Sequence, residues 1–202
     1  MLKFTRALIF ACLSGVFLFT GLGGCKQQAA ERKFYAADIT SVEFGNNLNL
    51  TDHNGKARTL ADFKGKAVVI FFGYTHCPDV CPTTLSDMAQ ALDLLGNDAS
   101  KVQVLFVTVD PARDTQSLLA SYVPSFNPSF LGLYGDEAAT TRVGKEFHIY
   151  YQKQQGKNSQ NYSIDHTAGS FVFDQTGKLR LHINYGQGAE KIAHDLRALL
   201  IN

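Results

Sequence analysis

The chain has 202 residues, 45% of them hydrophobic, which is enough for one globular domain with a single core. Lysine and arginine together number 19, aspartate and glutamate 18, and no basic or acidic block stands out along the chain. This charge pattern gives no sign of binding to nucleic acid or another polyanion, so we expect no nucleic-acid partner.

The N-terminus has the features of an export signal. Lys3 and Arg6 precede an apolar run over residues 7–19, which is short of the ~20 residues that a membrane-spanning helix needs. Small residues then precede Cys25 in the sequence LGGC, which resembles the bacterial lipobox, where a signal peptidase cuts before a cysteine that becomes lipidated. There are two alternatives: the N-terminal segment is an uncleaved membrane anchor, or it is an ordinary cleaved signal peptide and Cys25 lies beside the cleavage site by chance.

These features divide the chain into three predicted parts. Residues 1–24 would be a lipoprotein signal peptide, with Cys25 as the lipidated first residue of the mature protein. Residues 25–38 are largely polar and lack apolar periodicity, as expected of a tether between a lipid anchor and a folded body. Residues 39–202 would then form a single domain on the periplasmic face of a bacterial membrane.

The domain is predicted to begin with a hairpin, a buried strand and an amphipathic helix. Asn54-Gly55 lies between alternating segments, which indicates a hairpin turn. Residues 66–74 are rich in β-branched and aromatic side chains, as in a buried strand. Apolar residues then recur at helical spacing until Gly96 ends the pattern: Leu85, Met88, Ala89, Leu92 and Leu95.

A second strand and three further helices follow in the prediction. Residues 102–109 form the second buried strand, and the next helix presents one apolar face: Leu118, Leu119, Tyr122, Val123 and Phe126. A short apolar segment, residues 130–134, precedes a helix with Asp136 as its N-cap. Residues 152–161 are predicted to be a polar loop, Gln175-Thr176-Gly177 a second hairpin turn, and residues 189–200 the closing helix.

This order of elements resembles the thioredoxin-like arrangement. Alternating strands and helices imply right-handed crossovers and parallel strands, while the two hairpins add antiparallel ones. We therefore expect an α/β fold, thioredoxin-like, with a mixed central sheet and helices on both faces. In such a fold the segment after a central strand lies at the carboxyl ends of the strands, where ligands bind. Cys77 and Cys81 lie in that segment.

The two cysteines are predicted to be chemically active. Cys12 lies in the predicted signal peptide and Cys25 would be lipidated, so Cys77 and Cys81 are the remaining thiols. A disulfide between them would close so small a loop that it would restrain little of the unfolded chain. Each precedes a proline, and we expect Pro82 at the first position of the helix. The helix dipole would then favour the thiolate, which both metal binding and disulfide exchange require.

His166 favours metal binding over disulfide exchange. Thioredoxin-type reductases carry a proline before the strand that faces the cysteines, whereas this chain has no proline near residues 165–174 and has His166 there. Two thiolates and one imidazole suit Cu(I), while structural zinc would normally need a fourth protein ligand. Cu(II) would accept the same three with an oxygen donor from Asp79, Asp110 or Asp165, and these choices stay open.

The motifs GYTHCPDVCP, VTVDPARDT and DHT resemble those of the Sco/SenC family of copper proteins, over roughly residues 39–200. The resemblance implies one copper held by Cys77, Cys81 and His166. It also implies a role as a metallochaperone that delivers copper to the CuA centre of cytochrome c oxidase, not as an enzyme in the turnover sense. The partner would be the CuA-bearing subunit or another envelope copper or thiol protein. Alternatives are a thiol-disulfide oxidoreductase, with Cys77 and Cys81 as its redox pair, and a copper or redox sensor.

Other polar residues have more ordinary predicted roles. Asp114 is expected to cap the helix that follows it, while Asp79 and Asp110 are expected to lie beside the metal ligands and tune them electrostatically. Tyr74 is expected in the core. His76 is predicted to be a surface or supporting residue rather than a ligand. The remaining histidines are expected to be partly exposed and without a special role: His53, His148, His182 and His194.

Overall fold

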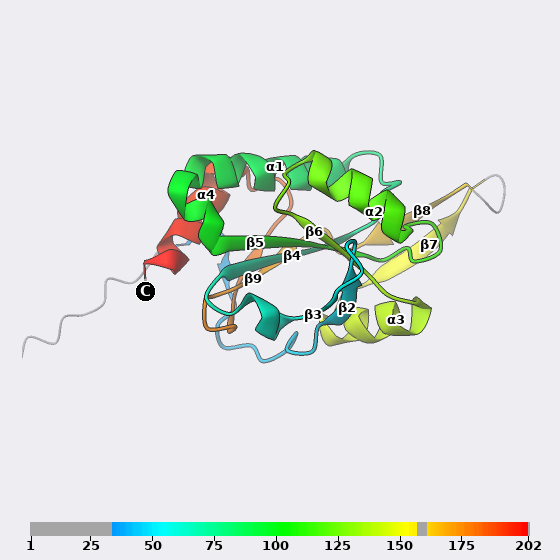
Figure 1. Ribbon diagram of the computed structural model, residues 1–202, viewed down its shortest axis with the longest axis horizontal. Helices are drawn as coiled ribbons and strands as arrows, with labels where there is room; N and C mark the ends of the chain where they lie inside the picture. The colour runs from blue at the N-terminus through cyan, green and yellow to red at the C-terminus, as the bar shows by residue number, and fades with distance from the viewer. Residues whose placement is uncertain (1–33, 157–160, 202) are drawn as a thin grey trace, which may run out of the picture. The chain divides into compact units, whose positions relative to one another are not determined.

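The folded part of the chain is a mixed β-sheet with helices on both faces in the computed structural model, which describes residues 34–156 and 161–201 (Figure 1). Its strands are β1 (Ala37–Asp38), β2 (Asn49–Asp52), β3 (Ala57–Thr59), β4 (Ala67–Gly73), β5 (Val102–Thr108), β6 (Leu131–Tyr134), β7 (Tyr151–Gln155), β8 (Tyr162–His166), β9 (Ser170–Phe173) and β10 (Leu179–Ile183). Within the described residues, the main sheet has the order β1-β10-β9-β4-β5-β6-β2-β3, and β7 and β8 form a separate ribbon. The predicted α/β, mixed-sheet fold is confirmed.

The centre of the sheet is the parallel pair β4 and β5. Every residue of both strands is buried, which is why their sequences are continuous apolar runs rather than alternating ones. Their register pairs Ala67 with Val102 and Gly73 with Thr108, so both strands end at the same edge of the sheet. The segments that follow Gly73 and Thr108 therefore start side by side, and the first of them contains the cysteines.

The helices lie on both sides of this sheet, with α1 and α2 on one side and α3 on the other (Figure 1). Their bounds are α1 (Val80–Leu95), α2 (Gln116–Tyr122), α3 (Glu137–Glu146) and α4 (Ala189–Leu200), with short 3₁₀ segments η1 (Leu60–Phe63), η2 (Gly96–Lys101) and η3 (Val123–Ser125). Asp136 caps α3 as predicted, because its Oδ1 accepts from Ala139 N at 2.7 Å. The second helix is shorter than predicted because Pro124 ends the α-helical hydrogen bonding, and the chain continues as η3.

Both predicted hairpins are present. The β2–β3 turn contains Gly55 at φ +83°, and the β9–β10 turn contains Gly177 at φ +85°. These left-handed backbone conformations are strained for residues with a Cβ, so the glycines determine where each turn forms.

Two segments that were predicted to be irregular are strands. Residues 152–161 were predicted to be a polar loop, but most of β7 lies among them and pairs with β8, just after them, as an antiparallel ribbon that extends from the body (Figure 1). β7 is polar and largely exposed, so it carries no apolar alternation by which a strand could be recognised. β8 does alternate, with buried Ile164 between exposed Ser163 and Asp165, but the pattern spans only five residues. The predicted tether was also too long, because β1, at Ala37–Asp38, pairs with β10. Its two residues are too few to show periodicity.

The start of the folded body is held by a buried carboxylate. Asp195 on α4 accepts hydrogen bonds from Tyr35 N at 2.9 Å and Ala36 N at 2.8 Å. Residues 1–33, including the predicted signal peptide, Cys25 and most of the predicted tether, lie outside the described residues. None of the helices within residues 34–156 and 161–201 combines the length and the hydrophobicity of a membrane-spanning segment.

Candidate metal centre

The loop after β4 carries Cys77, and Cys81 is the second residue of α1. The helix begins earlier than predicted, with Asp79 as N-cap, so Pro82 is the third helical residue and not the first. A proline is tolerated there because the first N–H groups of a helix have no intrahelical partner, and the first bond of α1 runs from Thr83 N to Asp79 O at 3.1 Å. Both thiols are free.

Gly73, the last residue of β4, provides the space for the Cys81 sulfur. A Cβ at Gly73 would lie 2.8 Å from Cys81 Sγ and 2.9 Å from Phe106 Cε2, closer than real side-chain contacts. The absence of a side chain at this position lets a fully buried Cys81 pack against the end of the strand.

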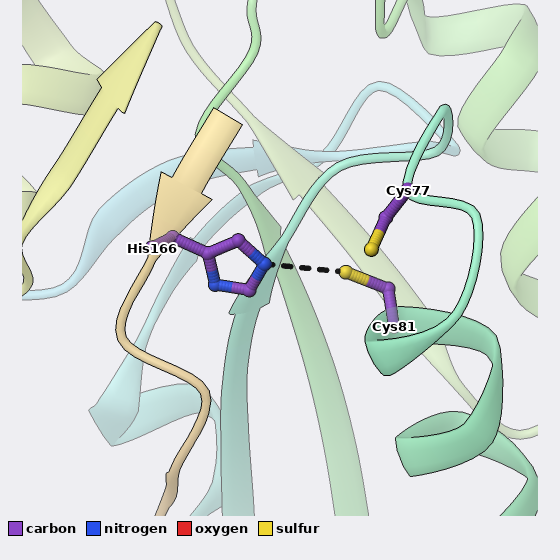
Figure 2. Close-up of side chains that lie close together, drawn as sticks. All are labelled: Cys77, Cys81 and His166. Carbon is purple, nitrogen blue, oxygen red and sulfur yellow. Dashed lines mark hydrogen bonds between the residues drawn. The ribbon is translucent and has the colours of Figure 1, made fainter. Parts of the chain in front are cut away.

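His166, the last residue of β8, completes a group of three potential ligands with Cys77 and Cys81 (Figure 2). Its Nε2 lies 3.4 Å from Cys81 Sγ, and the ligand atoms of all three residues lie within 4.8 Å of one another. Among the described residues, this is the one group of three or more such side chains close enough to share a metal ion. The structure thus brings together the three residues that the sequence singled out.

The hydrogen bonds of His166 determine its tautomer, and so which ring nitrogen offers a lone pair to a metal. Nδ1 lies 2.9 Å from the Thr167 carbonyl oxygen, which can only accept, so Nδ1 carries the proton. Burial lowers the pKa of His166, which keeps the ring neutral. Nε2 is then unprotonated and directed at Cys81, which is the form of histidine that binds metals.

Cys81 is a protonated thiol in the metal-free protein, in contrast to the predicted thiolate. Burial raises the pKa of the Cys81 thiol, and the nearby Cys77 and Asp114 raise it further. This loss of hydration outweighs the effect of the helix N-terminus. The Cys81 S–H therefore donates to His166 Nε2, and a metal that binds both atoms must displace this proton.

Tyr74 positions β8 next to the cysteines. It is buried in the core, as predicted, and its hydroxyl oxygen accepts from Ile164 N at 3.2 Å. Its ring also meets the His166 ring edge-on, with 5.9 Å between the centroids. Tyr74, which directly follows β4, therefore contacts β8, the strand that ends at His166. The sequence did not predict this positioning role of Tyr74.

Asp114 anchors the cysteine loop and does not cap α2, so that prediction was wrong. Thr115 is the N-cap, and its hydroxyl accepts from Leu118 N at 3.2 Å. The buried Asp114 carboxylate instead accepts from Thr75 N at 3.0 Å, Thr75 Oγ1 at 2.6 Å and Thr108 Oγ1 at 2.6 Å. It thus ties the loop after β4 to the end of β5.

Replacing Asp114 with asparagine is expected to change the pH dependence of stability. Burial raises the pKa of Asp114, so the folded state binds more protons than the unfolded state above the unfolded value of about 3.9. Asp114 therefore makes the protein less stable as pH rises through this window. The free energy of unfolding of the wild type, minus that of Asp114→Asn, should therefore fall as the pH rises above about 4. Urea unfolding at a series of pH values measures this difference. Asp93→Asn, on the exposed side of α1, is the control. If the stability of the two variants depended on pH in the same way, the pH dependence could not be attributed to Asp114.

Asp110 contributes to a second contact between the end of β5 and β8. It accepts hydrogen bonds from Arg113 Nε and from Tyr162 Oη, the latter at 2.7 Å. The Arg113 guanidinium lies over the Tyr162 ring, 3.5 Å from its centroid, and donates to the Tyr162 carbonyl at 2.9 Å. This cluster holds the first residue of the strand whose last residue is His166. The predicted electrostatic effect of Asp110 on the site stays a prediction.

The carboxylates considered as an oxygen ligand lie outside the Cys77–Cys81–His166 group in the described part of the chain. Asp79 is exposed and accepts from Thr83 Oγ1 at 3.3 Å. Asp165 is also exposed and accepts from Gln154 Nε2 at 2.7 Å. Asp110 is held by Arg113 and Tyr162.

The other histidines do not join the group. His76 has a half-exposed side chain whose Nδ1 lies 3.1 Å from Thr75 Oγ1, as expected of a residue that is not a ligand. His53 was predicted to be partly exposed, but it is buried and its Nδ1 accepts from Gly132 N at 3.0 Å. The reason is that β2 pairs with β6 and covers the turn, a contact between segments far apart in the chain.

The fold and this group of side chains define a thioredoxin-like α/β protein with two cysteines and one histidine at the carboxyl ends of its central strands. The family model described as SCO1/SenC matches residues 36–201, nearly all of the folded part. The chain therefore belongs to the SCO1/SenC family.

Known relatives agree with this assignment. The chain is 33% identical over 193 residues to a mitochondrial SCO2 homologue from Bos taurus, covering 95% of this chain and 72% of that protein. Among solved structures, copper-bound ScoI from Bradyrhizobium japonicum is 42% identical with a TM-score of 0.73, over 78% of this chain and 100% of that one. Apo Sco1 from Thermus thermophilus is 37% identical with a TM-score of 0.75, over 85% and 99%.

Proposed function

We propose that the protein is a copper metallochaperone that carries one copper ion on Cys77, Cys81 and His166 and delivers it to the CuA centre of cytochrome c oxidase. The observation that carries this proposal is the convergence of three potential ligand atoms within 4.8 Å of one another. The similar ScoI structure from Bradyrhizobium japonicum has copper bound, which supports copper as the cargo. The oxidase as the recipient follows from the Sco/SenC resemblance.

The spacing of the ligand atoms fits a metal ion. With the bond lengths that zinc makes to thiolate and imidazole, a tetrahedral angle places sulfur and nitrogen about 3.5 Å apart. The observed distance between Cys81 Sγ and His166 Nε2 is 3.4 Å. An ion could therefore take the place of the Cys81 proton with little movement of either side chain, and two thiolates with one neutral imidazole are a donor set that favours Cu(I).

The exposure of the ligands suggests how copper would leave. Cys81 is fully buried, whereas Cys77 and His166 are half-buried. An incoming thiolate, imidazole or thioether of the acceptor would displace an accessible ligand while Cys81 still holds the ion. A three-ligand site leaves a coordination position for this attack, so transfer can proceed by ligand exchange.

Replacing His166 with alanine is expected to weaken copper binding without abolishing it. The reduced wild-type protein should bind one copper per chain in an anaerobic titration. His166→Ala should lower the affinity by about 10- to 100-fold or more, because two thiolates remain but the third donor is gone. His76→Ala is the matched control, since His76 adjoins Cys77 but lies outside the ligand group. Unchanged affinity in His166→Ala would exclude the three-ligand site.

A thiol-disulfide oxidoreductase is the second candidate, because the two free sulfurs lie within 4.8 Å of each other at a helix start. The two functions are separated by mixing the protein with a CuA-domain acceptor in its oxidised and its reduced form. Transfer of copper from the loaded protein to the reduced acceptor, but not to the oxidised one, supports delivery. Reduction of the oxidised acceptor by the copper-free dithiol, with no metal needed, supports the oxidoreductase.

We also propose that the mature protein is held by lipid on Cys25 at the periplasmic face of a bacterial membrane. The lipobox-like LGGC sequence and a structural neighbour described as a SCO1/SenC family lipoprotein from Bacillus anthracis, 23% identical, motivate this. Mass spectrometry of the purified mature chain should find an acylated Cys25 as the first residue. An intact N-terminus at Met1 would contradict it.

A further inference from the structure

The strand that ends at His166 is not part of the main sheet. Among the described residues, β8 pairs with β7 alone, in a separate two-stranded ribbon. A two-stranded ribbon is marginally stable by itself in water, and its ladder hydrogen bonds do not fix its position against the rest of the domain. The position of His166 beside Cys81 therefore depends on side-chain contacts between β8 and the segments that follow β4 and β5.

Arg113, in the segment between β5 and α2, makes several of these contacts at once. Its guanidinium lies over the Tyr162 ring, 3.5 Å from the centroid, and its Nη1 donates to the Tyr162 carbonyl oxygen at 2.9 Å. Its Nε donates to the buried Asp110, which also accepts from the Tyr162 hydroxyl at 2.7 Å. The same guanidinium lies 5.7 Å from the centroid of the Tyr74 ring. Arg113 thus contacts both the first residue of β8 and the tyrosine that follows β4.

These contacts continue to His166 through Tyr74. The Tyr74 hydroxyl accepts from Ile164 N, in the middle of β8, at 3.2 Å. Its ring meets the His166 ring edge-on, with 5.9 Å between the centroids. A five-residue extended strand that is anchored at its first and third residues has little freedom left at its fifth, which here is His166.

We propose that Arg113 is a positioning residue of the copper site, which holds His166 Nε2 within reach of Cys81 by fixing β8 against the domain. A guanidinium suits this role because it stacks on a ring and donates in several directions at once, whereas a lysine ammonium is a point charge on a flexible stem. Arg113 also belongs to the VTVDPARDT motif, to which the proposed function gives no task. This inference rests on the proposed function.

The direction of the effect separates positioning from electrostatics. Arg113 is a cation near a site for a copper cation, so the loss of its charge alone would strengthen copper binding. Arg113→Met should instead lower the copper affinity about tenfold, because His166 is less often in place to complete the site. Arg113→Lys keeps the charge but loses the stacking and the paired donors, so it should lower the affinity by a similar factor.

A double-mutant cycle tests whether Arg113 acts through His166. In an anaerobic competition titration of the reduced proteins, Arg113→Met should weaken copper binding in wild type but cause no further decrease in the His166→Ala background. Arg58→Met is the matched control, because the side chains of Arg58 and Arg113 are each 18% exposed and each pairs with a fully buried aspartate. Arg58 also lies over a ring, that of Phe63, but in the β2–β3 hairpin. Its substitution should leave the copper affinity unchanged.

Hydrogen exchange of the Ile164 amide tests the same contacts without copper. The amide should exchange about 5- to 10-fold faster in Arg113→Met than in Arg58→Met, since its bond to the Tyr74 hydroxyl opens more often when β8 is released. Urea unfolding shows whether the two substitutions lower the stability of the copper-free protein alike, as their similar burial predicts. If Arg113→Met does not fold, Arg113→Lys takes its place in both measurements.

Four results would each overturn the inference: a copper affinity of Arg113→Met equal to that of Arg58→Met, the same decrease in the His166→Ala background as in wild type, wild-type affinity in Arg113→Lys, or unchanged exchange at Ile164. If wild type itself binds no copper, the proposed function fails, and the exchange of Ile164 still decides whether Arg113 holds β8.

Discussion

Tight copper binding is expected to be lost when Cys81 is replaced by serine, with an affinity decrease of at least about 100-fold. The change is nearly isosteric, so the fold should persist, and the serine hydroxyl can still donate to His166 Nε2 in place of the thiol. The variant lacks the soft thiolate that Cu(I) requires, and a buried hydroxyl does not ionise to replace it. Competition with a Cu(I) chelator measures the affinity of the reduced protein.

Cys77→Ser is expected to lose binding similarly, because one thiolate and one imidazole leave a two-ligand site. Far-UV circular dichroism of both variants checks that the fold is retained. Thr84→Ser is the control, since it changes a side chain of the same helix that bonds Val80 O rather than the group of ligands. Copper binding of wild-type strength in either serine variant would contradict the proposed ligand set.

Gly73→Ala is expected to destabilise the copper-free protein by about 1–3 kcal/mol and to weaken copper binding. The new methyl group would lie 2.8 Å from Cys81 Sγ and 2.9 Å from Phe106 Cε2. Neither neighbour can move freely, because Cys81 is in the first turn of α1 and Phe106 is fully buried in β5. Chemical denaturation measures the stability. A copper titration measures the affinity, which should be lower if the new methyl group displaces Cys81.

A double-mutant cycle tests this reason directly. Cys81→Ala removes the sulfur that the new methyl group would meet, so Gly73→Ala should cost less stability in that background than in wild type. The residual cost would report the contact with Phe106. If the effects of the two substitutions on stability were additive, the methyl group of Gly73→Ala and the Cys81 sulfur would not compete for space, and the packing explanation would be wrong.

Local patterns were sufficient for most of the fold. The buried runs at β4 and β5, the helical spacing that ends at Gly96 and the turns at Gly55 and Gly177 act within a few residues, so the sequence predicted them. The ribbon of β7 and β8 was missed because β7 is polar and largely exposed, and the apolar alternation of β8 around Ile164 spans only five residues. The pairing of β1 with β10 was missed because two residues cannot show a period.

For the metal centre, the components could be recognised in the sequence: two cysteines after a buried strand and a histidine in a motif shared with the Sco/SenC family. Their chemistry depends on how the folded chain brings them together. The 3.4 Å contact between Cys81 and His166 joins residues 85 positions apart, and it depends on Tyr74 holding β8 in place. Burial, which no local pattern reveals, outweighs the helix dipole and keeps Cys81 protonated until a metal displaces the proton. The same three-dimensional packing assigns Asp114 to the cysteine loop instead of a helix cap, because its partners Thr75 and Thr108 meet only where β4 and β5 end together.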